Sequence, residues 1–131
     1  MKKGKQPHQV LIVDDSPTQC LVWKAFMESR YGDHIKVDTF NNPLDAFPHF
    51  KSSVSLLVID WIMPHMDGKQ VLAEAKKRGV DSKKIIMVSI RSADLLHENF
   101  KPGECLAVIE KNEPSQLGAL LQILDEMFIP V

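Results

Sequence analysis

The 131-residue sequence has little cysteine, almost no net charge and no long apolar run. Its two cysteines, Cys20 and Cys105, lie in no paired motif, so we expect two buried free thiols in a reducing compartment, ahead of a disulfide or a metal site. Sixteen Lys and Arg residues against 17 Asp and Glu leave a net charge of −1, which argues against a broad nucleic-acid-binding surface. These features predict a cytoplasmic protein without direct nucleic-acid binding.

The sequence also lacks the patterns of targeting and membrane segments. The lysines near its start are followed only by the short apolar run Val10–Val13, which is too short for a signal-peptide core or a membrane span. A Gly-rich phosphate loop, a catalytic Cys-His pair and a zinc-ligand cluster are absent as well. We therefore expect no membrane association, and we expect residues 1–8 to form a flexible tail.

Five short apolar runs alternate with segments that have helical patterns. The runs are Val10–Val13, Ile35–Phe40, Val54–Ile59, Lys84–Ile90 and Cys105–Ile109. Four of them are almost wholly apolar, which is typical of central strands in a parallel sheet covered on both faces. The second run alternates apolar and polar residues, as an edge strand does. The alternation predicts one α/β domain over residues 1–131, with helices on both faces of the sheet.

Capping residues and prolines mark the expected helices. Ser16-Pro17 predicts the start of a first helix, and Asn42-Pro43 predicts a second helix that Pro48 should cut short. A third helix is expected from Asp67-Gly68 to near Gly79, a fourth over Ser92–Asn99, and a fifth with Pro114 as its first residue. The fifth should bury one apolar stripe, made of Leu117, Leu120, Leu121, Leu124 and Phe128.

Polar residues stand where the predicted strands end. Asp14 and Asp15 follow the first run, Asp60 follows the third, Ser89 lies near the end of the fourth and Lys111 follows the fifth. Ligands of open α/β sheets bind beyond the carboxyl ends of the strands, so neighbouring first and third strands would bring three carboxylates together. Close carboxylates repel one another, and a divalent cation such as Mg²⁺ relieves that repulsion. With a hydroxyl and an ammonium beside it, this set suits phosphoryl transfer to a carboxylate.

The stretch LLVIDWIMPHMDG, from Leu56 to Gly68, contains the central acid of this set. An apolar strand ends on Asp60, and residues typical of turns follow at once. The turn can direct the backbone carbonyl of Ile62 at the same metal ion, while Pro64 and Gly68 shape the loop into the third helix.

The chain resembles the receiver domain of bacterial two-component response regulators, most plainly the stand-alone chemotaxis-type regulators. The resemblance spans about Gln9 to Phe128 and rests on four motifs, VLIVDDSPT, LLVIDWIMPHMDG, IIMVSI and VIEKNEP. It implies a flavodoxin-like fold, a doubly wound five-stranded parallel sheet in the order 2-1-3-4-5. It also implies Asp60 as phosphoacceptor, Ser89 as hydrogen-bond donor to the phosphoryl group, and Lys111 as its charge partner. The implied ligands of Mg²⁺, with Mn²⁺ as an alternative ion, are Asp15, Asp60, the Ile62 carbonyl and, through water, Asp14.

The function that the resemblance implies is a two-component switch. A sensor histidine kinase or a phosphotransfer protein would donate a phosphoryl group to Asp60. The domain would catalyse its own phosphorylation and dephosphorylation without being a conventional enzyme. The face made of the fourth helix, fifth strand and fifth helix would then bind a downstream protein or a second copy in a homodimer. The chain is either a stand-alone regulator or a receiver domain from a longer protein.

Three residues depart from the pattern of the family. Val108 stands where an aromatic switch residue is usual, Ile90 where a small residue is usual, and Asn112 where proline is usual. These departures favour the alternative of an interaction module that works without phosphorylation, and the intact acidic set opposes it. A phosphatase with an aspartate nucleophile would need a second acid two residues after that nucleophile. Counted from Asp14 this position is Ser16, and counted from Asp15 it is Pro17, which argues against this function.

Overall fold

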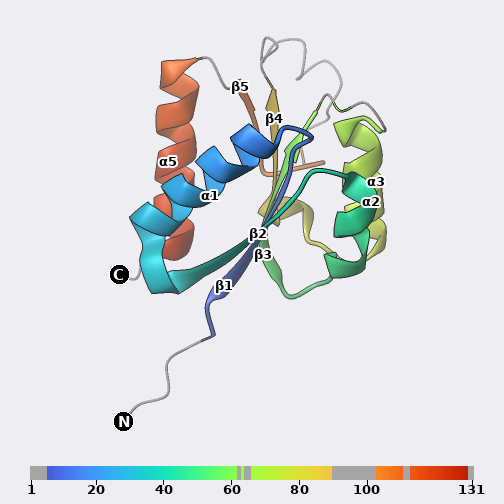
Figure 1. The fold of residues 1–131 in the computed structure, drawn as a ribbon, viewed down its shortest axis with the longest axis horizontal. Helices are drawn as coiled ribbons and strands as arrows, with labels where there is room; N and C mark the ends of the chain where they lie inside the picture. The colour runs from blue at the N-terminus through green and yellow to red at the C-terminus, as the bar shows by residue number, and fades with distance from the viewer. Residues whose placement is uncertain (1–5, 62, 64–65, 90–102, 111–112, 130–131) are drawn as a thin grey trace.

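The computed structural model describes residues 6–61, 63, 66–89, 103–110 and 113–129. These residues form a five-stranded parallel sheet in the order β2-β1-β3-β4-β5, which confirms the predicted topology (Figure 1). The strands are β1 (His8–Val13), β2 (Ile35–Phe40), β3 (Val54–Asp60), β4 (Ile85–Ser89) and β5 (Ala107–Glu110). In the register of the sheet, Val13 pairs with both Phe40 and Ile59, so β1, β2 and β3 end at nearly the same level.

Helices cover both faces of the sheet, as Figure 1 shows. One face carries α1 (Pro17–Tyr31) and α5 (Pro114–Phe128), and the other carries α2 (Pro43–Ala46) and α3 (Gly68–Lys77). Each face has its own buried cluster. Leu11 of β1 packs in the cluster that contains Leu72 of α3, whereas Ile12 packs in the one that contains Leu124 of α5. Because both faces are buried, the middle of each central strand is a continuous apolar run, such as Val10–Val13 in β1 and Leu56–Ile59 in β3.

The predicted helix boundaries are largely confirmed. The hydroxyl of Ser16 accepts a hydrogen bond from the backbone N–H of Gln19 at 3.2 Å and so caps α1. Asn42 caps α2, which has only four residues before the chain turns into a 3₁₀ helix containing Pro48. At α3, Asp67 and Gln70 form a reciprocal capping box. Helix α5 begins at Pro114, as predicted, and the fourth predicted helix, Ser92–Asn99, lies outside the described residues.

Strand β1 begins within the segment that we expected to be a tail. His8 pairs with Ile35 of β2, and its ring nitrogen lies 3.2 Å from the hydroxyl of Ser55. The His8 ring also packs against Phe128, with 5.3 Å between the ring centroids. The apolar run starts at Val10, but these contacts extend the strand two residues further toward the N-terminus.

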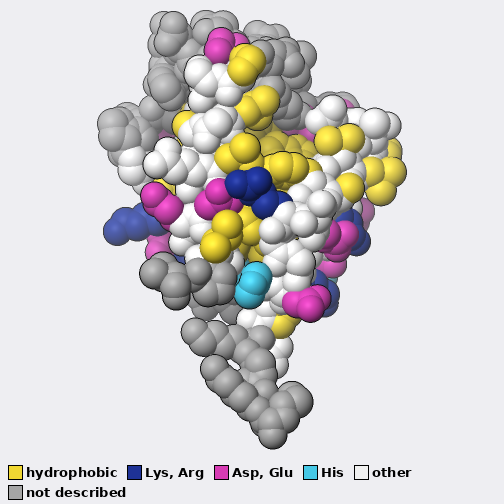
Figure 2. Space-filling view, turned by 90° about the vertical axis from the view of Figure 1, so that its left-hand side faces the viewer, with side chains coloured by type: hydrophobic (Ala, Val, Ile, Leu, Met, Phe, Trp, Pro, Cys, Tyr) yellow, Lys and Arg dark blue, Asp and Glu magenta, His cyan; other side chains and the backbone are white. Residues whose placement is uncertain are grey.

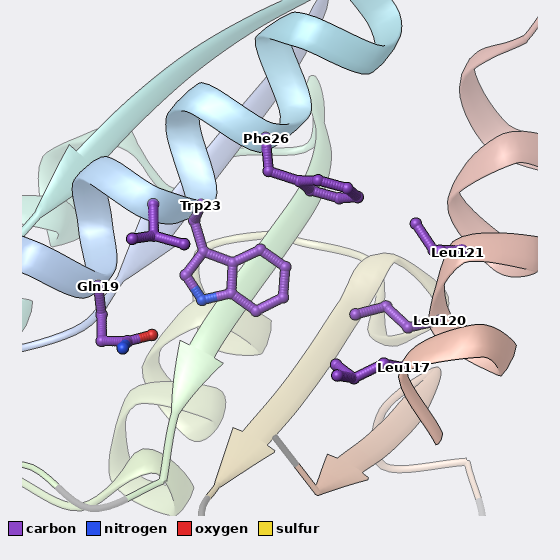
Figure 3. Close-up of a pocket in the computed structure, with 7 residues that line it drawn as sticks. Gln19, Trp23, Phe26, Leu117, Leu120 and Leu121 are labelled. Carbon is purple, nitrogen blue, oxygen red and sulfur yellow. The ribbon is translucent and has the colours of Figure 1, made fainter. Parts of the chain in front are cut away.

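The expected apolar stripe of α5 divides into a buried and a partly exposed side. Leu120, Leu124 and Phe128 are buried, whereas Leu117 is 37% exposed and Leu121 is half-buried. Leu117 was therefore wrongly predicted as a core residue. The reason is that Leu117 and Leu121 line an open groove of about 350 Å³ between α1 and α5. Figure 2 shows hydrophobic side chains on this face, and Figure 3 shows Trp23 and Phe26 of α1 facing α5 across the groove.

The cysteines are free thiols, as predicted, with Cys20 buried and Cys105 only half-buried. None of the helices in the described ranges combines the length and apolar character that crossing a membrane requires.

A polar cluster joins α1 to α5 beside the groove. The Arg30 guanidinium donates two hydrogen bonds to Asp125, at 2.8 and 2.7 Å, and the Tyr31 hydroxyl donates a third at 2.8 Å. The hydrogen bonds from Arg30 and Tyr31 lower the pKa of Asp125 to about 2. Burial, together with the hydrogen bond to Asp125, raises the pKa of Tyr31 to about 12.

Tyr31 is the only tyrosine in the chain, so tyrosinate absorbance reports its ionisation. We expect a midpoint near pH 12 in the folded protein, against about 10 in the unfolded chain. Because folding favours the neutral phenol, its contribution to stability is complete below about pH 10 and is lost as the pH rises toward 12. Asp125→Asn should lower the midpoint. A midpoint near 10, with circular dichroism showing a folded chain, would contradict this assignment.

Candidate metal centre

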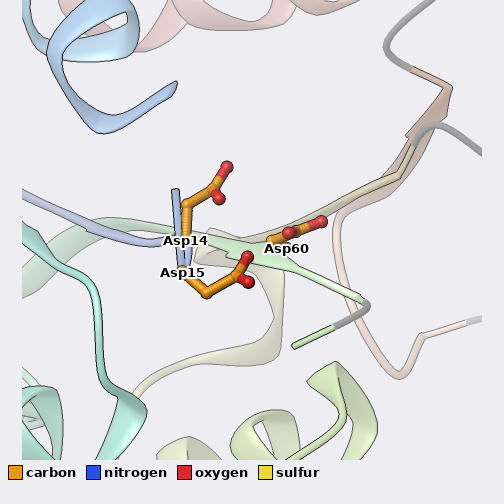
Figure 4. A group of neighbouring side chains, drawn as sticks. All are labelled: Asp14, Asp15 and Asp60. Carbon is orange, nitrogen blue, oxygen red and sulfur yellow. The ribbon is translucent and has the colours of Figure 1, made fainter. Parts of the chain in front are cut away.

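Three carboxylates meet at the carboxyl ends of β1 and β3. Asp14 and Asp15 follow the last residue of β1, and Asp60 is the last residue of β3. Because these central strands pair side by side and end together, oxygens of all three side chains lie within 4.8 Å of one another (Figure 4). Asp14 is 1% exposed and Asp60 is 8% exposed, whereas Asp15 is exposed to solvent. The predicted convergence of the acids is thus present.

The backbone and carboxylate of Asp14 are both held by hydrogen bonds. Its N–H donates to the carbonyl of Phe40 at 3.0 Å, which extends the β1–β2 pairing by one residue. Its Oδ1 accepts a hydrogen bond from the N–H of Ser16 at 3.0 Å, at the start of α1. Its carbonyl accepts a hydrogen bond from the side-chain amide of Asn41 at 3.1 Å. These bonds fix the turn that positions the two adjacent acids.

The chain after Asp60 is tied to the neighbouring strand and to α3. The N–H of Trp61 donates to the carbonyl of Val88 at 2.9 Å, and the carbonyl of Trp61 accepts from Gly68 at 2.7 Å. The half-buried Trp61 therefore lies next to the acids, where its fluorescence can report events at the site. A Cβ added to Gly68 would lie 2.8 Å from the Trp61 Cα and 2.5 Å from the Met87 Cε. Glycine at this position lets α3 approach the end of β3.

Gly68→Ala should therefore destabilise the fold, by about 1–3 kcal/mol, because the added methyl group meets backbone that cannot move aside cheaply. Gly118→Ala in α5 is the matched control, since a Cβ there meets no atom within 4 Å. That change should stabilise the protein by about 0.5–1 kcal/mol through helix propensity. Urea unfolding measures both values. Equal stabilities for the two variants would contradict the close approach at Gly68.

Ser89 lies at the same carboxyl end of the sheet, on the opposite side of Asp60 from Asp14 and Asp15. Asp60 pairs with Val88 of β4, so Ser89 stands one position beyond it on the neighbouring strand. Ser89 is buried, at 1% exposure, and pairs with Glu110 of β5. The predicted positions Ile62 and Lys111 lie outside the described residues, so their roles stay predictions. Ile90 and Asn112 also lie outside them, while Val108 is half-buried and pairs with Met87.

The arrangement can hold a divalent cation. Three carboxylates in one small volume repel one another, and a cation bound between them removes that penalty. Carboxylate oxygens are hard ligands that suit Mg²⁺, an ion that keeps several waters in its coordination sphere. The exposed Asp15 leaves one side of the cluster accessible to solvent. The donor set therefore fits Mg²⁺ and the similar ion Mn²⁺.

The contacts of Cys20 and Asn41 with the acidic turn were not predicted from the sequence. The Cys20 thiol donates to the carbonyl of Asp14 at 3.3 Å, beside the amide of Asn41. No sequence signal marks either residue, because the contacts depend on the pairing of β1 with β2 and on the packing of α1. The capping pattern of Asp67 and Gln70, in contrast, is readable from spacing alone.

A model of the response regulator receiver domain family matches residues 10–123. The chain belongs to this family. The receiver domain is 26% identical over 113 residues to a transcriptional regulatory protein, the CpxR homolog of Haemophilus influenzae, with 78% of this chain and 48% of that protein covered. It thus spans about half the length of the curated relative that it matches.

Solved structures show the same flavodoxin-like fold. The response regulator TrrA of Thermotoga maritima, in complex with Mg²⁺-BeF, has a TM-score of 0.72 at 21% identity, covering 92% of this receiver domain and 98% of that chain. A response regulator receiver protein of Pseudomonas putida has a TM-score of 0.73 at 20% identity, with 94% and 99% covered. The chemotaxis protein CheY4 of Vibrio cholerae has a TM-score of 0.66 at 19% identity, with 89% and 98% covered.

Proposed function

We propose that this receiver domain accepts a phosphoryl group on Asp60 in a reaction that depends on Mg²⁺. The observation that carries the proposal is the convergence of Asp14, Asp15 and Asp60, whose oxygens lie within 4.8 Å of one another. Membership of the receiver family supports the reaction class. The complex of TrrA with Mg²⁺-BeF, described for that protein, supports the choice of ion.

Asp60 is the nucleophile in the proposed reaction. One of its carboxylate oxygens attacks the phosphorus of a phosphohistidine on a sensor histidine kinase or a phosphotransfer protein. The P–O bond forms as the P–N bond breaks, and the departing imidazole takes a proton from solvent. Strand β3 delivers the carboxylate at a fixed place, because its neighbours Ile59 and Trp61 are held by pairing with β1 and β4.

The acids beside Asp60 would hold the ion. Asp15 and Asp60 are proposed as direct ligands, Asp14 as a ligand through water, and the carbonyl of Ile62 as a further ligand. When bound, Mg²⁺ neutralises negative charge on the carboxylates and on the transferring phosphoryl oxygens. The fixed turn at Asp14 keeps the two adjacent acids in place before the ion binds.

Two further side chains are proposed to act on the phosphoryl group. The hydroxyl of Ser89, buried at the end of β4, would donate a hydrogen bond to a phosphoryl oxygen. Lys111, which follows β5 in the sequence, would pair with another oxygen and offset its charge.

The output of the switch is proposed to be a change in protein binding. The face that includes β5 and α5 would bind a downstream protein or a second copy, together with the predicted fourth helix. The two thiols of Cys20 and Cys105, which form no disulfide, support a reducing, cytoplasmic location for this domain, where it would meet these partners.

Intact-mass spectrometry tests the proposed reaction. The protein is incubated with a small-molecule phosphodonor, once with Mg²⁺ and once with EDTA. We expect a gain of one phosphoryl group per chain with Mg²⁺ and none with EDTA. If tryptophan fluorescence shows Mg²⁺ bound and neither the phosphodonor nor a phosphohistidine donor raises the mass, the proposed function is wrong.

A further inference from the structure

At the acidic turn formed by Asp14 and Asp15, hydrogen bonds between backbone groups give way to hydrogen bonds from side chains. Backbone pairing between β1 and β2 ends at Val13 and Phe40, and the Asp14 N–H continues it with one bond to the Phe40 carbonyl. The next backbone group along the chain, the carbonyl of Asp14, is held by side chains. The Nδ2 of Asn41 donates to it at 3.1 Å, and the thiol of Cys20 donates at 3.3 Å.

Asn41 joins three separate parts of the chain at this point. It lies in the connection between β2 and α2, while Asp14 follows β1 and Cys20 belongs to α1. Besides its bond to Asp14, its amide contacts the Cys20 sulfur at 3.3 Å. The carbonyl of Asp14 thus receives one donor from α1, which follows the turn, and one from the connection between β2 and α2.

The orientation of this carbonyl matters for Asp15. The carbonyl carbon of Asp14 and the nitrogen of Asp15 share one planar peptide unit, so holding the oxygen fixes the plane. The plane in turn sets the direction in which the Asp15 side chain leaves the backbone. Asp15 is the exposed member of the acidic cluster.

We propose that Asn41 is a positioning residue for the Mg²⁺ site, acting through the Asp14–Asp15 peptide. This inference rests on the proposed function, because it concerns the same metal centre. Asn41 contacts the backbone carbonyl of Asp14 and is not itself proposed as a ligand of the ion. Without its amide the Asp14 carbonyl keeps only the weaker thiol donor of Cys20, so the peptide is held less firmly. The carboxylates then spend less time in the arrangement that holds a cation. Outer-shell groups of this kind typically alter metal affinity by about 10–100-fold.

The test is a Mg²⁺ titration of wild type and Asn41→Ala, followed by tryptophan fluorescence, with Trp61 next to the site. We expect the Kd of the variant for Mg²⁺ to be about tenfold higher. Asn41→Gln keeps an amide on a longer stem at this exposed position and should recover most of the affinity. Circular dichroism of each variant verifies that it is folded.

Asn42→Ala is the matched control. The neighbouring Asn42 accepts a hydrogen bond from the N–H of Leu44 at 3.0 Å and caps α2. Its loss should lower the urea midpoint and leave the Kd for Mg²⁺ unchanged. A merely structural role of Asn41 would give that same result.

The outcomes separate this inference from the proposed function. If Asn41→Ala binds Mg²⁺ within about twofold of the wild-type Kd, the positioning role is wrong and the metal site stands. If the wild type gives no saturable response to Mg²⁺, by fluorescence and by calorimetry, the metal site and the positioning role are both wrong.

Discussion

Asp60→Asn is expected to reduce phosphoryl incorporation to below detection, while the wild type gains one phosphoryl group per chain. The amide oxygen of asparagine has no negative charge and is a poor nucleophile toward phosphorus, and the variant also has one charged ligand fewer for Mg²⁺. The substitution preserves size and removes a charge from a repulsive cluster, so the protein should still fold. Intact mass after incubation with a phosphodonor and Mg²⁺ measures the effect.

Asp33→Asn serves as the control for this prediction. Asp33 is an exposed acid just before β2, so it lies at the amino ends of the strands, whereas the acidic cluster lies at their carboxyl ends. The Asp33→Asn variant should gain one phosphoryl group per chain, as the wild type does. If Asp60→Asn gained a phosphoryl group at the wild-type rate, the acceptor would be another residue and the assignment of Asp60 would be wrong.

Asp15→Asn is expected to be more stable than the wild type without Mg²⁺ and less stable than the wild type when Mg²⁺ is added. Without the ion, the variant should be the more stable protein, because one of three mutually repelling charges is gone. With Mg²⁺ at about 100 times its Kd, the wild type should gain about 2.7 kcal/mol in free energy of unfolding by mass action. The variant, whose neutral amide is a weaker ligand than the carboxylate of Asp15, should gain little at the same concentration.

Thermal unfolding with and without Mg²⁺ measures this reversal. The melting temperatures of the two proteins should cross as the Mg²⁺ concentration rises, whereas Asp33→Asn should follow the wild type throughout. Parallel stabilisation of wild type and Asp15→Asn would mean that the ion binds elsewhere, and the proposed metal centre would be wrong.

Much of the fold could be predicted because it depends on local patterns. Nearly continuous apolar runs predicted the central strands β1, β3 and β4, and the alternating run Ile35–Phe40 predicted the edge strand that β2 is. The run Cys105–Ile109 has the pattern of a central strand, but β5 lies at the other edge of the sheet, so this interpretation was wrong. Ser16, Asn42 and Asp67 mark helix starts because a short polar side chain next to a helical segment satisfies its free N–H groups. The acids were placed correctly because parallel strands bring the residues that follow them to one edge.

What could not be predicted depends on contacts between distant segments. Leu117 has the spacing of a core residue, but the groove between α1 and α5 leaves it partly exposed. His8 lies before the apolar run and joins β1 through contacts with Ser55 and Phe128. The contact of Asn41 with the acidic turn likewise requires β1 and β2 to be paired.

Of the three departures from the family pattern, only Val108 lies within the described residues. Val108 is half-buried on β5 and packs against the same cluster as Trp61, so it contributes to the core beside the site. Valine has no ring to move between a buried and an exposed position. If Asp60 is phosphorylated but partner binding does not change, the alternative of an interaction module that works without phosphorylation would gain support.

The most direct test of the central claim locates the phosphoryl group itself. An aspartyl phosphate is reduced by borohydride to homoserine, whereas a carboxylate and the phosphates of serine or histidine are not. The phosphorylated wild type is treated with borohydride, digested, and mapped by peptide mass spectrometry. We predict homoserine at position 60 alone, in the peptide that contains Trp61. Homoserine at another acid, or a phosphoryl group that survives borohydride on a different residue, would contradict the account.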